Sequence, residues 1–485
     1  MIAIFYTKRK QKAFEYFETM RDSAGLPDQG EPALNWSHTY TSQIGIIGGG
    51  ASGVVLAANL LRRLGPQIEI VLIEKQKVVG QGLAYSTWDP NHLLNVRAGN
   101  MSAYADQPDH FYNWLQIHGP RHGIGCPTHF CFVPRGVYGE YIGGLLHDHA
   151  DPHRLNIVRD ECVGISLAAS GADLILASGD RITVDYAVLA TGNEARLPVL
   201  AEHSHNPWEA GVLDRIRGNS PVLIVGTGLT MVDVVLSLFR RGHRGPITAI
   251  SRRGLLSQPH QLVPSRTLSQ AEVPFGAPVS ELLRWVRRQA RQAEAEGANW
   301  RSTIDAVRPH TQQLWKAMSL DQRRRFLRHT RPGWDVCRHR MAPQIADLIK
   351  NLRAEGRLRI VAARIVGAEG DGELTAVTLR HRGGEVTETI SVAAVLDCSG
   401  LPDDPRSSTN PVIKSLLAAG LVRPGPLEIG LDLADNGALI GAGGLVSSRL
   451  FAIGPLARGV LWESTALPDI RNQCAELATL LGSML

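Results

Sequence analysis

A glycine-rich turn between an apolar run and a helical pattern is the feature that most constrains this chain. Residues 43–47 read QIGII, GGGASG follows, VVLAANLLRRLG has helical apolar spacing, and IEIVLIEK is typical of a second strand. Strand, glycine turn, helix and strand make a βαβ unit. The same order recurs in SPVLIVGTGLTMVDVVLSLFRRG followed by PITAISRRG. The sequence therefore predicts two copies of one dinucleotide-binding architecture.

The first turn has the residues that a dinucleotide site needs. Gly50 lets the backbone approach a pyrophosphate, and Gly53 lets the helix pack closely on the strand. Glu74 ends the next strand, where a carboxylate accepts hydrogen bonds from an adenosine ribose. The helix N-terminus adds free N–H groups for phosphate oxygens. This context favours a nucleotide site over a structural turn, with predicted contacts from Gly48, Gly50, Ala51, Ser52, Gly53 and Glu74.

The second turn differs from the first at two informative positions. Met231 replaces the third glycine, which predicts a slightly wider gap between helix and strand. Arg252 and Arg253 replace the acid, and arginine pairs with a 2′-phosphate that a carboxylate would repel. A surface turn in a domain that has lost its ligand is the alternative. The sequence predicts an NADPH site with contacts from Gly226, Gly228, Thr230, Arg252 and Arg253.

A second pair of repeated segments sets the domain organisation. Residues 163–192 resemble short strands ending in DYAVLATGN, and residues 360–400 repeat them, ending in AAVLDCSG. Thr191 and Gly192 are expected to approach the first nucleotide. The fold class is α/β, with two Rossmann-like, three-layer dinucleotide-binding domains, the second nested within the first. The predicted bounds are an extension over 1–41, a first domain over 42–215 and 396–485, and a second over 216–395 with a helical insert at 265–345.

Charge and hydropathy exclude some classes of protein. No apolar run approaches the ~20 residues that span a bilayer, and the N-terminus lacks the order of a secretory signal, so we expect a cytoplasmic protein without a membrane partner. The net charge is +5, and residues 284–340 hold 14 Lys and Arg against 5 Asp and Glu. A solvated basic face or a field for anionic ligands explains this segment. No nucleic-acid-binding module accompanies it. One helix is expected around residues 9–23.

The cysteines indicate neither a metal site nor a disulfide framework. The chain has six cysteines, without a CxxC pair or zinc-ligand spacing. Cys126 and Cys131 have a spacing used by some flavin disulfide reductases, but they lie far beyond Glu74. We therefore interpret them as two unrelated buried thiols in a reduced compartment.

With these residues in place, the chain resembles the bacterial FAD-NAD(P)-binding family of two-dinucleotide-binding-domain flavoproteins. The resemblance covers about residues 43–480. It implies FAD in the first site, Gly454, Pro455 and Leu456 near the flavin ring, and the segment 95–102 beside it. The motifs that carry it are GGGASG, GLAYSTWDPNHLLNVRAGNMS, FVPRGVYGEY, ATGN, NPW, GTGLTMVD, SRRGLL, WDVCRHRMAP and GPLARGVLWESTALPDIRNQ.

The layout also resembles the single-component flavin monooxygenases. That resemblance implies hydride transfer from NADPH to FAD and oxygenation of a small polar amine or sulfide through a flavin hydroperoxide, with dioxygen as co-substrate. HSHNPW, with His205 and Trp208, matches the monooxygenase marker only in part, and a packed histidine and tryptophan explain it equally well. Asn95, Arg97 and Arg135 are the predicted substrate-site residues, followed by His339 and Arg340; each arginine could equally form a structural ion pair.

Three other functions stay open at this point. The runner-up is an NADPH-dependent flavin reductase or dehydrogenase that passes electrons to an organic acceptor or an acidic partner protein. A non-catalytic FAD-binding redox sensor would fit the changed second turn at Met231. Disulfide reduction is the least favoured. The sequence leaves homo-oligomerisation and the identity of the substrate open.

Overall fold

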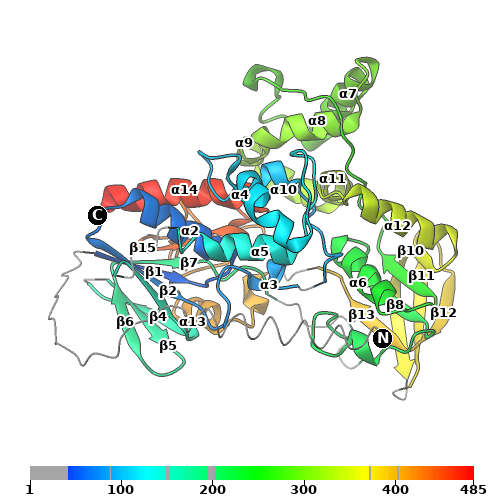
Figure 1. The fold of residues 1–485 in the computed structure, drawn as a ribbon, viewed down its shortest axis with the longest axis horizontal. Coiled ribbons are helices and arrows are strands. Elements are labelled where there is room, and N and C mark those ends of the chain that lie inside the picture. Colours follow the sequence, from blue (N-terminus) through cyan, green and yellow to red (C-terminus); the bar gives the residue numbers. More distant parts are fainter. Residues whose placement is uncertain are drawn as a thin grey trace. The chain divides into compact units, whose positions relative to one another are not determined.

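The computed structural model describes residues 42–87, 89–148, 153–169, 171–194, 200, 203–370, 373–400 and 404–485 (Figure 1). The extension at 1–41 and the helix expected around residues 9–23 lie outside the described residues. No helix in the described part of the chain combines the length and apolarity needed to cross a membrane.

A six-stranded sheet forms the centre of the first domain. Its order is β14-β15-β7-β1-β2-β3, and every pair is parallel except β14–β15. β1 pairs with β2 in register from Ser42↔Ile68 to Ile47↔Ile73. The strands are β1 (Ser42–Ile47), β2 (Ile68–Ile73), β3 (Leu155–Val158), β7 (Tyr186–Leu189), β14 (Ala438–Ile440) and β15 (Val446–Ala452).

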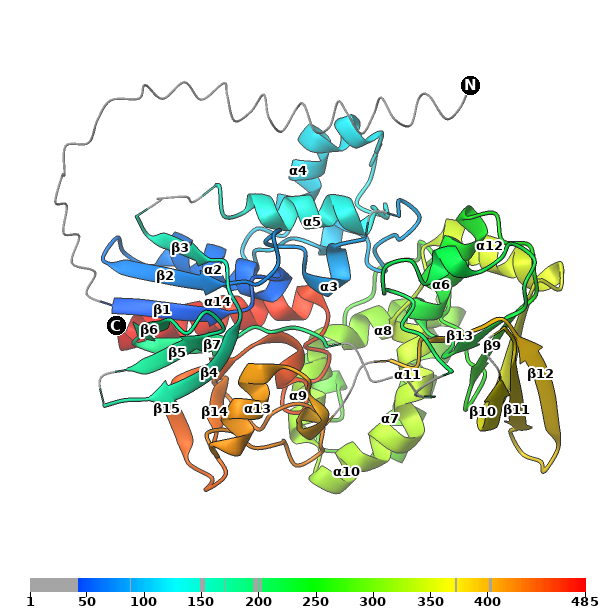
Figure 2. The same cartoon turned by 90° about the horizontal axis from the view of Figure 1, so that it is seen from below.

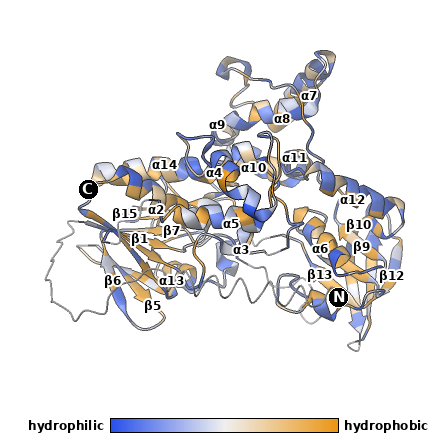
Figure 3. Ribbon diagram, in the orientation of Figure 1, coloured by the Kyte–Doolittle hydropathy of each residue, from blue (hydrophilic) through white to orange (hydrophobic). Residues whose placement is uncertain are grey.

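The apolar strands bury both faces of this sheet. Ile70 and Leu72 of β2 enter a core with α2 and α14, whereas Val71 and Ile73 face a core with β4, β5 and α13. This is the alternation that a strand with two buried faces requires, and Figure 3 shows much of the sheet in the apolar colour. The covering elements are α2 (Ala51–Arg63), α5 (Arg135–Gly144), α13 (Pro411–Ala418), α14 (Leu467–Met484), and the antiparallel sheet of β4 (Cys162–Leu167), β5 (Ala172–Leu176) and β6 (Arg181–Val184).

The second sheet repeats the centre of the first. β8 lies between β9 and β13 and is parallel to both, as β1 lies between β2 and β7. All its strands fall between β7 and β14 in the chain, which confirms the nested fold class. Its order is β12-β11-β10-β9-β8-β13, with β8 (Val222–Val225), β9 (Ile247–Ser251), β10 (Leu358–Gly370), β11 (Thr375–His381), β12 (Thr387–Val392) and β13 (Ala394–Asp397).

Two helices cover one face of the second sheet. α6 (Leu229–Arg240) follows the second glycine turn, and α12 (Pro343–Ala354) precedes β10. Both share a core with Val222 and Ile224 of β8. Met231 is fully buried in this core. The antiparallel hairpins of β10, β11 and β12 supply a second core on the other face.

A run of helices separates β9 from α12, as the sequence predicts (Figure 2). It packs on the returning part of the first domain, because Trp315 stacks on Trp462 and its Nε1 donates to the Gly459 carbonyl at 3.0 Å. The helices are α7 (Val279–Ala295), α8 (Trp300–Val307), α9 (Thr311–Ala317), α10 (Leu320–Arg325) and α11 (Arg331–Arg338), with a π-helical turn at Phe326–Thr330.

Candidate functional site

The first glycine turn is shaped by two close backbone approaches. Gly48 has φ of 107°, and a Cβ there would lie 2.5 Å from the Ala190 carbonyl oxygen. A Cβ on Gly53 would overlap the Gly48 carbonyl oxygen. Both positions therefore require glycine. The result is that α2 starts directly against the end of β1, with its free N–H groups facing outward at the carboxyl edge of the sheet.

A cavity of about 570 Å³ opens at this turn. Eight of the predicted FAD residues line it: Gly48, Gly50, Ala51, Ser52, Glu74, Thr191, Gly192 and Pro455. Gly53 lies behind the cavity, where it allows the close helix packing, and Gly454 is buried beside Ser52. Leu456 lines a smaller neighbouring cavity with Gly192 and Pro455.

Residues 75–78, Thr465, Leu467 and Ile470 line this cavity outside the predicted contacts, and so does one wall, the segment 81–86. It contains α3 (Gly82–Tyr85), and Gly82 has φ of 52° with its Cα facing Gly50. The signal was present, since GLAYS opens one of the family-like motifs. Tyr85 is half-buried here, and desolvation raises its pKa to about 12, so its hydroxyl stays protonated.

Two observations test whether these residues fit FAD. The Thr191 hydroxyl lines the cavity and has no hydrogen-bond partner among the described residues, so it can bond to a ligand. Gly50 and Gly82 both line the cavity without a side chain, so a phosphate chain can approach their backbone there. Glu74 accepts from Gly49 N at 2.8 Å and Gln76 N at 2.7 Å, which holds its carboxylate at the cavity wall. The residues present fit the cofactor.

The second glycine turn repeats this construction. Gly226 has φ of 115°, and a Cβ there would overlap the Cys398 carbonyl oxygen, as Gly48 does with Ala190. Ser399 follows Cys398 as Thr191 follows Ala190, and its hydroxyl is likewise buried without a partner in the described part of the chain. Gly228 precedes α6 as its N-cap residue, and Thr230 lies in the first turn of that helix. The second site therefore keeps the backbone features of a dinucleotide site.

The structure separates the two arginines predicted for the NADPH phosphate. Arg253 donates to the carbonyl oxygens of His329 at 3.1 Å and Arg328 at 2.9 Å, so it anchors the π-helical turn of the insert. Arg252 is exposed directly after β9, the position of the ribose-binding acid in the first copy. Arg252 is thus the better placed of the two for a 2′-phosphate.

A small cationic cavity lies between the first domain and the helical insert. It measures about 70 Å³ and brings together two predicted substrate-site residues, Asn95 and Arg97. Arg340, a further sequence candidate, lines the same cavity and pairs with Asp305. Sequence reasoning did not find the rest of the lining, because those residues come from distant segments. We call this space the cationic cavity; its lining is Asn95, Val96, Arg97, Asn100, Phe130, His260, Gln261, Asp305, Arg308, Arg338 and Arg340.

Two carboxylates lie behind this cavity. Arg338 Nε donates to Glu463 Oε2 at 2.9 Å, and its Nη2 is 3.8 Å from Asp469 Oδ2. Burial would raise the pKa of Glu463, but Arg338 and the other cations around it hold that pKa below its ordinary value. Asp469 lies between Leu467 and Ile470, which line the FAD cavity. The cationic cavity is therefore adjacent to the Leu467–Ile470 end of the FAD cavity.

Arg135 does not join the other substrate-site candidates, so this prediction needs correction. Its Nη1 lies 2.8 Å from Asp233 Oδ2, and its Nε donates to the Leu93 carbonyl. Asp233 is buried on α6, so the pair ties α5 of the first domain to the second. His339 does not line the cationic cavity either, and burial lowers its pKa to about 4.

The HSHNPW segment has a structural role. His205 extends the second sheet by a parallel bridge to Leu396, and its backbone bonds to Val395 and Asp397. Trp208 is 40% exposed and contacts His92 edge to face. The contacts of His205 agree with a packed linker histidine, whereas the exposure of Trp208 contradicts a core tryptophan.

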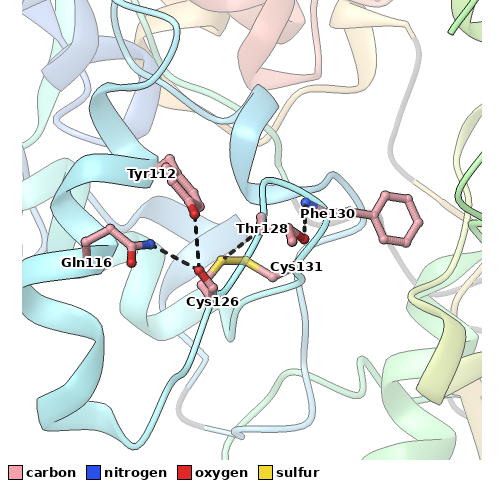
Figure 4. The surroundings of a disulfide bond; sticks show 6 residues. All are labelled: Tyr112, Gln116, Cys126, Thr128, Phe130 and Cys131. Atoms are coloured by element: carbon pink, nitrogen blue, oxygen red, sulfur yellow. Dashed lines mark hydrogen bonds between the residues drawn. A yellow bond between two sulfur atoms is a disulfide. The ribbon is translucent and has the colours of Figure 1, made fainter.

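Cys126 and Cys131 form a disulfide, so the interpretation as unrelated thiols was wrong (Figure 4). Their Cα atoms are 5.7 Å apart, a separation that a disulfide spans. The Cys131 carbonyl accepts from Ala98 N at 2.9 Å, so the closed loop supports the segment that carries Arg97. Neither cysteine lines the FAD cavity or the cationic cavity.

Removing this disulfide is expected to lower stability without releasing FAD. A Cys126→Ser/Cys131→Ser variant should lose about 2 kcal/mol of unfolding free energy, because the short loop gains entropy in the unfolded chain. Urea unfolding followed by circular dichroism measures the loss, and flavin absorbance measures retention. Wild-type protein treated with a reductant serves as the matched control and should show the same shift. Equal stability with and without reductant would contradict the pairing.

The comparisons with known proteins agree with this architecture. The FAD-NAD(P)-binding family profile matches residues 45–194, which contain the end of β1, the first glycine turn and β7. The fold and these two turns are those of the two-dinucleotide-binding-domain flavoproteins, and residues 45–194 match the FAD-NAD(P)-binding family. No curated protein matches the sequence significantly.

Solved structures with the same fold span nearly the whole chain. Ornithine N-hydroxylase from Kutzneria sp. 744 is 15% identical, with 91% of this chain and 99% of that chain covered and a TM-score of 0.63. L-lysine 6-monooxygenase from Pseudomonas syringae is 15% identical, with 92% and 100% covered and a TM-score of 0.61. Bacillithiol disulfide reductase from Bacillus cereus is 14% identical, with 92% and 99% covered and a TM-score of 0.50. At these identities the likeness establishes the fold alone.

Proposed function

We propose that the protein is an NADPH-consuming FAD monooxygenase that adds one oxygen atom to a small polar amine or sulfide. The observation that carries this proposal is the pair of matching glycine turns, each with a buried, unpartnered hydroxyl, beside a separate small polar cavity. Two nucleotide sites serve electron transfer, and the third space suits a substrate. Among proteins of this fold, the ornithine and lysine enzymes are named for amine oxygenation.

The protein's own residues bind and orient the two cofactors and shield the space between them. The first turn and the N-terminus of α2 hold the FAD pyrophosphate, and Thr191 donates its hydroxyl. The second turn, with Arg252, holds NADPH. FAD supplies hydride acceptance and activation of dioxygen. The helical insert, fixed on the first domain by Trp315 and Trp462, excludes water from the space between the sites.

Oxygen transfer is tested by product analysis. The holoprotein is incubated with NADPH, dioxygen and a panel of small amines and sulfides, and products are examined by mass spectrometry with isotopically labelled dioxygen. A product carrying one labelled oxygen atom, with matching NADPH consumption, is expected. NADPH oxidation that yields only reduced oxygen or a reduced organic acceptor would instead support the reductase alternative.

Arg252 is expected to set the preference for NADPH. An Arg252→Ala variant should raise the Kd for NADPH roughly tenfold, because a charge-assisted bond to the 2′-phosphate contributes about 1.5–3 kcal/mol. The Kd for NADH, which lacks that phosphate, should change little. Fluorescence titration of both nucleotides measures the two constants, with Arg359→Ala, on β10 of the same domain, as the control. An equal increase in the Kd for both nucleotides would show that Arg252 does not bind the 2′-phosphate.

A further inference from the structure

The cationic cavity contains buried donors that the protein does not satisfy. Arg338 is 6% exposed and Arg340 is 2% exposed. Arg338 Nη2 and Arg340 Nε have no hydrogen-bond partner among the described residues. A buried donor without an acceptor costs about 1–3 kcal/mol, and more when it is charged. These two donors at one cavity are available to an acceptor from outside the chain.

The charges at the cavity favour an anionic group. The Arg97 side chain forms no hydrogen bond or ion pair with any residue that the structure describes, whereas Arg340 pairs with Asp305. Arg308 and Arg338 lie 3.7 and 3.8 Å from Asp469, and Arg338 also pairs with Glu463. Among the arginines that line the cavity and their direct ion-pair partners, four arginines face three carboxylates, and Arg97 supplies the excess positive charge. One monoanion would neutralise the cluster.

The size and position of the cavity limit which ligands it can hold. A volume of about 70 Å³ holds a group the size of a carboxylate, since a water molecule takes roughly 30 Å³. It is far too small for a nucleotide. The adjoining FAD cavity of about 570 Å³ has the room for one. Asn95 and Asn100 add uncharged amide groups to the same wall.

We propose that the cationic cavity binds the carboxylate of the substrate, with Arg97, Arg338 and Arg340 as its donors. The substrate is then a carboxylate-bearing amine or sulfide, such as an amino acid, anchored by its acid end. Guanidinium groups bind carboxylates through paired N–H donors, which fixes orientation as well as charge. This assignment rests on the proposed function, and it adds the substrate class.

Binding of acetate tests the site without requiring turnover. Acetate is the smallest stable organic carboxylate, and acetamide is its uncharged counterpart. Saturation-transfer NMR on the oxidised holoprotein at constant ionic strength should show saturable binding of acetate and none of acetamide. Arg97→Gln should weaken acetate binding roughly tenfold or more, because the excess charge and its donors are lost. Since the Arg97 side chain has no partner within the described residues, this variant should keep its fold and FAD.

Control variants and competitors separate the remaining explanations. Arg284→Gln, on the exposed face of α7 in the same basic segment, should leave acetate binding unchanged. Equal weakening in both variants would mean a diffuse field rather than a site and would overturn the proposal. Displacement of acetate by NADP⁺ or inorganic phosphate, at concentrations that fill the second nucleotide site, would assign the cavity to a cofactor phosphate and also overturn it.

The proposed function can fail separately from this inference. NADPH-dependent reduction of the flavin is measured on the same samples without oxygen. Acetate binding without flavin reduction would keep the carboxylate site and refute the electron-transfer function. Flavin reduction without acetate binding would refute the carboxylate site alone.

Discussion

Replacing Gly53 with alanine is expected to abolish FAD retention and to lower the free energy of unfolding by about 3 kcal/mol. The new Cβ would overlap the Gly48 carbonyl oxygen, and Gly53 is buried in the first turn of α2. Because neither backbone segment can move without shifting the glycine turn, the N–H groups that face the pyrophosphate would be displaced. Flavin absorbance of the purified protein and urea unfolding measure the two effects.

Gly144 provides the matched control for this substitution. It ends α5, and a Cβ there meets no atom within 4 Å. Gly144→Ala should therefore retain FAD and be neutral or slightly stabilising, since alanine costs less backbone entropy than glycine in a helix. Full flavin content in Gly53→Ala would contradict the assignment of this turn to FAD.

Removing Arg135 is expected to cost about 3 kcal/mol of unfolding free energy. Arg135 is the ion-pair partner of Asp233, which is 5% exposed, so Arg135→Ala would leave a buried carboxylate without its counter-ion. The pair also connects α5 to α6, the helix that follows the second glycine turn. Denaturant unfolding measures the loss. An Arg135→Met/Asp233→Leu double variant should recover much of it, because it removes both charges together.

The effect of Arg135→Ala should depend on pH with a definite sign. Burial raises the pKa of Asp233 in the folded protein even beside Arg135, which lowers it. Without Arg135 the folded-state pKa would rise further above the unfolded value. A raised carboxylate pKa gives stability that is present at low pH and lost as pH rises through the folded pKa. The variant should therefore be closest to wild type in acid, and a constant or growing deficit toward low pH would contradict this account.

The repeated elements could be predicted from the sequence because their patterns are local. A strand, glycines at fixed spacing and an amphipathic helix follow one another within each copy, and the glycines stand where a strand end leaves no space for a side chain. The pairing of Gly48 with Ala190 and of Gly226 with Cys398 shows the same demand met twice. The glycine-turn side of the FAD cavity followed from these patterns and Pro455 from the family resemblance, whereas residues 75–78 and 81–86, Thr465, Leu467 and Ile470 were not predicted.

The roles of single polar residues could not be predicted in the same way. Arg135 lies in a family-like motif, but its partner Asp233 is on a helix of the other domain. The sequence around either residue contains no pattern that predicts this ion pair. Cys126 and Cys131 have a spacing that permits a disulfide without requiring one. The cationic cavity draws Arg97, Asp305 and Arg340 from three segments, and only the folded chain shows that they converge.

The most direct test of the central claim is anaerobic stopped-flow reduction of the holoprotein by NADPH and by NADH. In the proposed function FAD binds at the first glycine turn and NADPH at the second, so NADPH should bleach the flavin absorbance rapidly and in proportion to bound FAD. NADH should act much more slowly at equal concentration, because it lacks the 2′-phosphate. Flavin that stays oxidised with either nucleotide would contradict electron transfer between the two sites.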